Sequence, residues 1–334
     1  MNHEKLLEVK NLDTAYRFGD DYYNAVDNVS LTLHRNEVLA IVGESGCGKS
    51  TLATAVMGLH NPQNTRLSGE VLYNGRNLLE YTEDEYNDIR GKEIGMIFQD
   101  PLGSLNPLMR VGDQVAEALF YHSDKTKQER YDRVIELLDR VQIVNPERVY
   151  RQYPHELSGG MRQRIVIAIA LANDPNIIIA DEPTTALDVI IQAEILRLMK
   201  DIEHKSNSGI ILITHDLGVV AQMADRVAVM YAGEVVEEAD VVELYENPLH
   251  PYTRSLLRSI PQNLDDDDER NELHVIQGTV PSLRNMPRHG CRFAPRIPWT
   301  PANAHEENPT LHEVTPGHLV RCTCWKHFEF KDGE

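Results

Sequence analysis

Short, continuous apolar runs recur along the chain and are separated by stretches with helical spacing. The first run covers residues 38–42, and further runs follow at residues 94–98, 177–180, 210–214 and 227–230. Uninterrupted apolar runs of this length are typical of strands that are covered on both faces. Their alternation with helical segments predicts an α/β fold built on a parallel sheet.

Two other regions depart from this alternation. Residues 6–9 and 29–33 look like half-buried strands, which predicts a small antiparallel β subdomain at the edge of the fold. From about residue 101 to 160 the buried-strand pattern disappears, and a helical insertion is expected. One of its helices should begin at the capping box that runs from Thr126 to Glu129.

The later helical stretch has an apolar stripe, which more simply indicates packing against the core than ligand binding. Its members are Ile191, Ile195, Leu198 and Ile202.

Composition narrows the functional class. The chain has 334 residues, of which 41% are hydrophobic and 25% charged, as in ordinary globular proteins. Its 33 basic and 52 acidic residues give a net charge of −19, which would repel a phosphate backbone, so no nucleic-acid partner is expected. No apolar window spans the roughly 18 residues that a membrane helix needs, and no signal peptide is recognised. Four cysteines do not make a disulfide framework.

The chain changes character towards its C-terminus. An acidic run at residues 265–269, interpreted as a solvated loop, precedes a tail rich in proline and histidine. We expect one large domain over residues 1–240 and a small, separate extension over residues 241–334.

A phosphate-binding motif follows the first buried strand. Residues 43–50 fit G-x-x-x-x-G-K-S and precede an apolar helical pattern. The glycines let backbone N–H groups turn inward, Lys49 should reach the β- and γ-phosphates, and the Ser50 hydroxyl should ligate Mg²⁺. The sequence predicts an ATP site formed by Gly43, Ser45, Gly46, Cys47, Gly48, Lys49, Ser50 and Thr51.

Two adjacent carboxylates follow the third buried run. Asp181 is expected to hold Mg²⁺, and Glu182 to polarise the attacking water as a general base. The alternative is a solvated pair of acids at a strand end.

A second glycine pair suggests another phosphate cradle. Residues 157–161 (Leu-Ser-Gly-Gly-Met) place Ser158 as a helix N-cap before Gly159 and Gly160. The segment resembles the signature of ATP-binding-cassette (ABC) ATPases, with Met161 in place of the usual glutamine. The resemblance covers residues 5 to about 240 and implies a P-loop NTPase fold. It also implies that ATP lies between the Gly43 loop of one subunit and the Ser158 segment of another.

The same resemblance assigns roles to other residues. Gln99 looks like the Q-loop glutamine, which contacts Mg²⁺ and the attacking water. Asp188, in Ala186-Leu187-Asp188, resembles the D-loop at the dimer interface. The alternative is a plain turn in which Asp188 is the N-cap of the next helix, and the two roles are compatible. His215 resembles the switch histidine that contacts the γ-phosphate. Tyr16 fits best as the aromatic that stacks on adenine, with Phe18, Tyr22 and Tyr23 as alternatives.

Three further segments resemble ATP-binding subunits of oligopeptide and dipeptide permeases. They are residues 99–107, 247–257 and 290–296. The resemblance implies an ATPase at the cytoplasmic face of a bacterial membrane that powers peptide import. Its partners would be a homologous ATPase, two transmembrane permease subunits and, indirectly, an extracellular peptide-binding lipoprotein. A nickel or other small-solute importer is the alternative, and less so a soluble ABC ATPase acting on nucleic acid or ribosomes. Glu182 argues against a mere ATP sensor.

The tail also raises the question of a metal. In many such relatives four tail cysteines bind a 4Fe-4S cluster. Here Cys291 and Cys322 match two of them, while Ile297 and Ala304 occupy the other places. Cys324 and one of His289, His305, His318 or His327 could supply the missing ligands for an iron–sulfur cluster or zinc. The alternative is a tail held by packing alone.

Overall fold

The computed structural model describes residues 4–185, 187–260 and 276–330. Its main sheet has eight strands in the order β11-β12-β10-β9-β3-β8-β7-β6. The strands from β9 to β6 pair in parallel, and each lies on one of the predicted apolar runs. This confirms the parallel α/β core. These strands are β3 (Val38–Val42), β6 (Ile94–Ile97), β7 (Ile177–Asp181), β8 (Gly209–Thr214) and β9 (Arg226–Tyr231).

The N-terminal strands form a second, antiparallel sheet, as expected. It has the order β2-β1-β4-β5, with β1 (Lys5–Phe18), β2 (Asp21–His34), β4 (Thr65–Tyr73) and β5 (Arg76–Asn77). Strands β1 and β2 are longer than the predicted segments because register shifts interrupt their alternation. One shift lies between Val9 and Leu12 and includes Asn11, whose φ is 48°.

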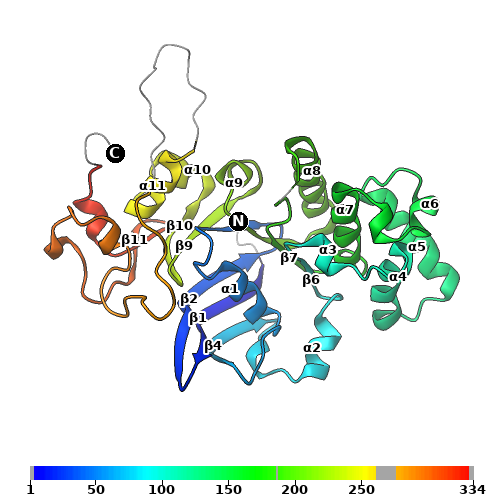
Figure 1. Cartoon of the computed structure of the whole chain (residues 1–334), viewed down its shortest axis with the longest axis horizontal. Helices are drawn as coiled ribbons and strands as arrows, with labels where there is room; N and C mark the ends of the chain where they lie inside the picture. The colour runs from blue at the N-terminus through cyan, green and yellow to red at the C-terminus, as the bar shows by residue number, and fades with distance from the viewer. Residues whose placement is uncertain (1–3, 186, 261–275, 331–334) are drawn as a thin grey trace, which may run out of the picture.

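The consecutive helices between β6 and β7 form the helical insertion. The expected insertion forms one end of the molecule, to the right in Figure 1, and contains α3 (Pro101–Ser104), α4 (Val111–His122), α5 (Lys127–Arg140), α6 (Pro146–Tyr150), η2 (Pro154–Glu156) and α7 (Gly159–Ala170). Helix α5 begins at the predicted capping box. The remaining helical segments are α1 (Lys49–Val56), η1 (Leu78–Glu80), α2 (Glu83–Ile89), α8 (Val189–Ser206), α9 (Leu217–Met223), α10 (Val241–Glu246), α11 (Pro251–Arg258), η3 (Ala294–Arg296), η4 (Ala302–Ala304) and η5 (Cys324–Lys326).

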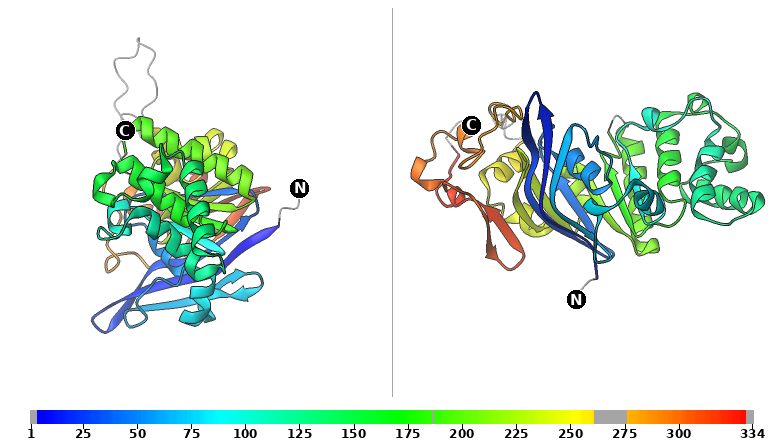
Figure 2. Two further views of the ribbon diagram at one scale, coloured as in Figure 1. Left: turned by 90° about the vertical axis from the view of Figure 1, so that its right-hand side faces the viewer. Right: turned by 90° about the horizontal axis from the view of Figure 1, so that it is seen from below.

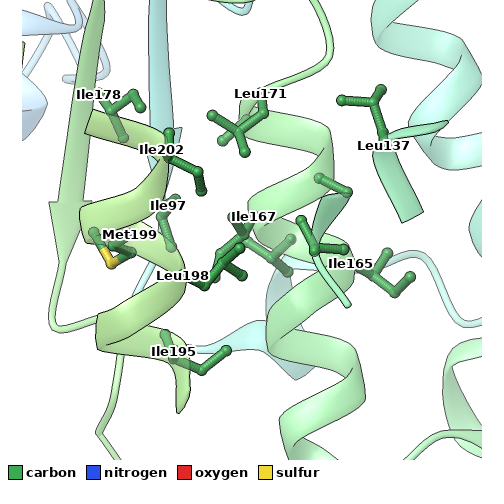
Figure 3. Packing of buried hydrophobic residues seen from close by; sticks show 14 of the residues in the cluster. Ile97, Leu137, Ile165, Ile167, Leu171, Ile178, Ile195, Leu198, Met199 and Ile202 are labelled. Carbon is green, nitrogen blue, oxygen red and sulfur yellow. The ribbon is translucent and has the colours of Figure 1, made fainter. Parts of the chain in front are cut away.

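The apolar stripe of α8 attaches the insertion to the main sheet. Ile195, Leu198 and Ile202 are buried in a cluster that also contains Ile167 and Leu171 of α7. In Figure 3, Ile195, Leu198 and Ile202 lie on the side of α8 that faces α7. The stripe therefore packs in the core, and the interpretation of these residues as structural is confirmed.

The C-terminal extension is not a separate unit, in contrast to the prediction. Strand β12 (His318–Arg321) pairs with β10 (Glu234–Asp240), so β12 and β11 (Leu311–Thr315) continue the main sheet. The rings of Tyr252 and Phe293 also pack together, with centroids 5.4 Å apart, in a core shared with β9. Figure 2 shows the extension on the side of the N-terminal sheet opposite the helical insertion. Its sparse periodicity concealed these strands, and the acidic run 265–269 lies outside the described residues.

Among the described residues, no helix is both long enough and apolar enough to cross a membrane.

Candidate nucleotide-hydrolysis site

The predicted phosphate-binding motif forms a loop between β3 and α1. Its last glycine, Gly48, has φ 110° and caps α1, and a Cβ atom there would lie 2.5 Å from the Ala25 carbonyl oxygen. Gly46 also has a positive φ, of 81°. Only glycine adopts such a path without strain, so both positions need it. Of the other predicted members, Ser45 and Ser50 are exposed, while Cys47 is buried.

Lys49 brings a buried positive charge into this loop. Its side-chain nitrogen donates hydrogen bonds to the carbonyl oxygens of Gly43 at 2.8 Å and Glu44 at 3.1 Å. Within the described residues Lys49 has no carboxylate close enough for a salt bridge, although the residue is only 5% exposed. Its charge acts on the Asp181 and Glu182 carboxylates only from a greater distance, by lowering their pKa values, and a buried cation is costly unless it is closely paired. The loop therefore fits an anionic ligand such as a phosphate group.

Ser50 and Asp181 put two oxygen ligands side by side. Asp181 ends β7, is buried, and accepts a hydrogen bond from the Ser50 hydroxyl at 3.1 Å. Burial raises the pKa of Asp181, against the effect of that hydrogen bond. Carboxylate and hydroxyl oxygens are donors that suit Mg²⁺. The oxygens of Ser50 and Asp181 therefore suit the Mg²⁺ ion that the sequence analysis predicts at these residues.

Glu182 lies at the centre of a polar network. Its carboxylate accepts hydrogen bonds from Gln99 at 3.1 Å and from Thr185 at 2.8 Å, and its other oxygen lies 3.2 Å from Nδ1 of His215. Burial by itself raises the pKa of Glu182, but the hydrogen bonds of Thr185 and His215 outweigh it and leave the pKa lowered. The carboxylate is therefore held ionised, as a general base must be.

These side chains meet because their strands are neighbours. Gln99 follows β6, Asp181 ends β7, His215 follows β8, and the phosphate-binding loop follows β3. Strands β3, β8, β7 and β6 are adjacent and parallel, so their carboxyl ends open on one edge of the sheet. Ligands bind at such edges in open α/β sheets. Glu182 itself has φ 47°, a left-handed conformation that is uncommon for a glutamate and clusters at functional sites.

Tyr16 lies beside the phosphate-binding loop. Its hydroxyl donates to the Thr51 side chain across 3.4 Å, between β1 and α1. The competing aromatics have other neighbours: Arg66 covers the ring of Tyr22, and Phe18 packs edge-on against Tyr23. Of the aromatics considered, Tyr16 is the one with a described contact to a residue of the predicted ATP site, Thr51.

The second predicted phosphate cradle lies apart from this network. The Ser158 hydroxyl caps α7 by accepting a hydrogen bond from the Met161 N–H, and Asp188 caps α8 in the same way. A Cβ atom on Gly160 would lie 2.7 Å from Ile191, whereas at Gly159 there is room. No described hydrogen bond joins Ser158, Gly159 or Gly160 to the loop at Gly43. The first residue of the proposed D-loop, Ala186, lies outside the described residues.

Sequence reasoning missed two contributors to this region. Thr185 belongs to none of the motifs recognised in the sequence, yet its hydroxyl donates a hydrogen bond to the Glu182 carboxylate. Glu44, an unspecified position in the loop motif, is held by the C-terminal extension. Its carboxylate accepts two hydrogen bonds from Arg296, and its N–H donates to the Tyr252 hydroxyl at 2.7 Å. Such long-range pairs leave no local sequence pattern.

Known proteins that resemble this chain are ATP-binding proteins of transporters, in agreement with the phosphate-binding loop and the acidic residues beside it. A family model described as "ABC transporter" matches residues 26–185, and one described as "Oligopeptide/dipeptide transporter, C-terminal region" matches residues 236–300. The oligopeptide transport ATP-binding protein OppD of Lactococcus lactis is 52% identical over 99% of this chain and 98% of its own length. AppD of Bacillus subtilis, also an oligopeptide transport ATP-binding protein, is 48% identical over 95% and 96%.

Solved structures of ATP-binding proteins also resemble this chain. The dimeric ATP-binding cassette MJ0796 bound to ADP and phosphate is 32% identical, with a TM-score of 0.64, and covers 71% of this chain and 99% of its own. The structure of cbiO1 from Clostridium perfringens, part of the transporter complex cbiONQ, is 29% identical with a TM-score of 0.62, covering 73% and 92%.

The chain therefore belongs to the ABC transporter ATPases, in the group that carries the oligopeptide/dipeptide transporter C-terminal region. It is an ATP-binding protein with a P-loop NTPase fold, in which ATP hydrolysis is coupled to transport.

Proposed function

We propose that this chain is the ATP-hydrolysing subunit of a bacterial importer of oligopeptides or dipeptides, bound at the cytoplasmic face of the membrane. The observation that carries the proposal is the combination of an ionised Glu182, held by three polar side chains, with a C-terminal region of the oligopeptide/dipeptide type. The relatives named as oligopeptide and dipeptide transport proteins match over nearly their whole length.

In this proposal the loop at Gly43 receives the phosphates of ATP. Lys49 supplies the positive charge for the β- and γ-phosphates, and backbone N–H groups between Gly43 and Ser50 donate to the phosphate oxygens. Ser50 and Asp181 would hold Mg²⁺ with help from Gln99, and the ion would neutralise charge on the phosphates. Tyr16 would stack on the adenine ring, since it adjoins Thr51 at the start of α1.

Hydrolysis needs an attacking water and a base. The Glu182 carboxylate accepts a proton from the water while the new oxygen–phosphorus bond forms and the bond to the β-phosphate oxygen breaks, so that ADP and phosphate leave. Gln99 and Thr185 fix the orientation of this carboxylate. His215 is 59% exposed, and is placed to contact the γ-phosphate from the same edge of the sheet.

A second ATPase subunit completes the site. Ser158, Gly159 and Gly160 begin α7 in the insertion, away from the loop at Gly43, so we assign them to the ATP of the partner subunit. Asp188 would lie at the interface between the subunits. Directly after it, Val189 and Ile190 are 82% and 72% exposed, which suits apolar side chains that a partner covers. The dimeric state of the related cassette supports this assignment.

The helical insertion is the proposed contact to two transmembrane permease subunits. It bears a groove of about 380 Å³ lined by Met109, Asp113, Ala116, Glu117, Phe120, Tyr121, Lys127, Arg130, Tyr131 and Tyr150. Phe120 and Tyr121 are largely exposed there, and Leu108 nearby is 85% exposed. Exposed apolar surface of this kind marks an interaction site.

Gln99 links the insertion to the hydrolysis site. Its side chain donates to Glu182, and it lies two residues before α3, the first helix of the insertion. Closure of the ATPase dimer would therefore move the insertion and, through it, the permease. An extracellular peptide-binding lipoprotein would deliver the substrate to that permease.

Import of nickel or another small solute is the second candidate. No residue in the described part of this chain selects one solute over the other. A soluble ABC ATPase acting on nucleic acid or ribosomes suits neither the net charge of −19 nor the C-terminal region.

Co-purification tests the transport function against a soluble ATPase that acts on nucleic acid or ribosomes. The tagged chain is isolated from the membranes of its own cells in mild detergent, and its partners are identified by mass spectrometry. We expect two multi-span membrane proteins and a homologous ATPase. Recovery of ribosomes or nucleic-acid-binding proteins in their place would overturn the transport function while leaving the ATPase assignment intact.

A further inference from the structure

Four metal-ligating side chains meet in the C-terminal extension. Cys291, His305, Cys322 and Cys324 each offer one donor atom, and these atoms all lie within 4.8 Å of one another. Cys322 and Cys324 are completely buried, and Cys291 is 8% exposed. The histidines at 289, 318 and 327, which were equal candidates from the sequence, are not part of the group. His318 contacts Glu237 at 2.8 Å instead.

This donor set does not fit the iron–sulfur cluster that the family resemblance implies. A 4Fe-4S cluster is held by four thiolates, each on a different iron, so its four donor atoms stand far apart around a cube. The chain has only three tail thiols, because Ile297 and Ala304 occupy the places of two cysteines. Both residues are buried, and the side chain of neither can bind iron.

The spacing of the four donor atoms suits a single ion with tetrahedral coordination instead. With zinc–sulfur bonds of about 2.3 Å, tetrahedral geometry sets neighbouring donor atoms about 3.8 Å apart. Donor atoms that already lie within 4.8 Å need to approach by only about 1 Å to meet this geometry. Three thiolates and one imidazole are a common donor set of structural zinc sites.

Two details of the surroundings point to a ligand. Nδ1 of His305 is buried and, among the described residues, has no hydrogen-bond partner. A buried nitrogen in this state costs free energy that a metal bond would remove. Cys322 has φ 68°, a strained conformation, and its sulfur accepts a hydrogen bond from the Glu306 N–H at 3.5 Å. Hydrogen bonds of this type orient and stabilise thiolate ligands.

We infer that Cys291, His305, Cys322 and Cys324 bind one Zn²⁺ ion, in place of the iron–sulfur cluster of related proteins. The ligands come from three separate segments: the stretch before η3, the end of η4, and the turn from β12 into η5. A single ion therefore fastens three segments with little regular structure to the edge of the main sheet. Metal binding at such a site contributes directly to folding free energy.

Metal analysis of the full chain tests this inference. The protein is purified without oxygen and without a metal-affinity tag, and zinc, iron and acid-labile sulfide are measured together. We expect about one zinc per chain, with neither iron nor sulfide. X-ray absorption at the zinc edge should show about three sulfur neighbours at about 2.3 Å and one nitrogen at about 2.0 Å. Iron and sulfide in equal amounts, or no metal and a mass lower by two hydrogens from a disulfide, would overturn it.

Variants test the individual ligands. His305→Cys keeps four donors and should retain one zinc with four sulfur neighbours, whereas His305→Ala should bind zinc at least about tenfold more weakly in a competition with a chelator. His289→Ala, an exposed histidine in the same extension, is the matched control and should bind zinc like the unaltered chain. Equal zinc affinity in His305→Ala would remove His305 from the ligand set. Metal content of the unaltered chain remains decisive if a variant does not fold.

Discussion

Arg296 of the C-terminal extension binds both carboxylate oxygens of Glu44, the second residue of the phosphate-binding loop, at 2.8 and 3.1 Å. The two residues are 252 positions apart in the chain. The side chain of Arg296 is only 7% exposed, and Tyr252 holds the backbone of Glu44 from the same extension. The part of the chain that resembles peptide permeases thus supports the loop that receives ATP.

Removing this arginine should weaken nucleotide binding. Arg296→Ala leaves the Glu44 carboxylate without its partner and frees the loop, so we expect ATP affinity to fall several-fold and unfolding free energy to fall by about 1–3 kcal/mol. Isothermal titration calorimetry and denaturant unfolding measure the two effects. Arg284→Ala, an exposed arginine of the same extension, is the control. Unchanged ATP affinity in Arg296→Ala would show that the contact is structural only.

Glu182→Gln should separate binding from hydrolysis. The amide keeps the size and most contacts of the side chain but cannot take a proton from water. We expect ATP affinity within about threefold of the unaltered chain and turnover at least about 100-fold lower, the usual loss for a missing general base. Radiolabelled ATP binding and phosphate release test both numbers. Hydrolysis near the normal rate would assign the base to another residue.

We expect Thr185 to influence the pH below which ATPase activity is lost. Its hydroxyl is the main hydrogen bond that lowers the pKa of Glu182 against the effect of burial. In Thr185→Val the pKa of Glu182 should rise, so the carboxylate becomes protonated at a higher pH. The acidic limb of the pH profile of kcat should therefore move to higher pH, with activity regained in more alkaline buffer. Thr185→Ser keeps the hydroxyl and should restore the original limb, and a uniform loss at every pH would contradict this role.

The signature serine should act on the partner's nucleotide. Ser158→Ala removes the N-cap of α7, which costs about 1 kcal/mol of stability, and also removes a proposed phosphate contact. We expect the isolated subunit to bind ATP normally, while turnover of the assembled dimer falls by more than about tenfold. Thr126→Ala removes an equivalent cap from α5, far from the nucleotide, and serves as the control. If both variants reduce turnover equally, Ser158 acts through stability alone.

The sequence predicted most of the parallel core and the catalytic edge because both follow from local patterns. Strands covered on both faces read as unbroken apolar runs, and β3 has the predicted bounds, residues 38–42. Parallel strands end on the same edge, so polar residues directly after them, such as Gln99 and His215, could be grouped without knowing any contact.

Other features could not be predicted because tertiary contacts decide them. Strand β12 is four residues long and owes its pairing to β10, and β4 follows no clear alternation. Four histidines of the tail were equivalent by sequence, and folding selects His305 by bringing it to the three thiols. The contact between Glu44 and Arg296 likewise depends on packing of the whole extension.

Peptide uptake by the purified complex is the most direct test of whether ATP hydrolysis at Glu182 powers peptide import. The complex is reconstituted into lipid vesicles with ATP on the side of this subunit, and a labelled oligopeptide is supplied with its binding protein on the opposite side. We expect ATP-dependent accumulation of peptide, which Glu182→Gln abolishes although the complex still assembles. Accumulation that persists with Glu182→Gln, or that occurs with nickel and not with peptide, would contradict it.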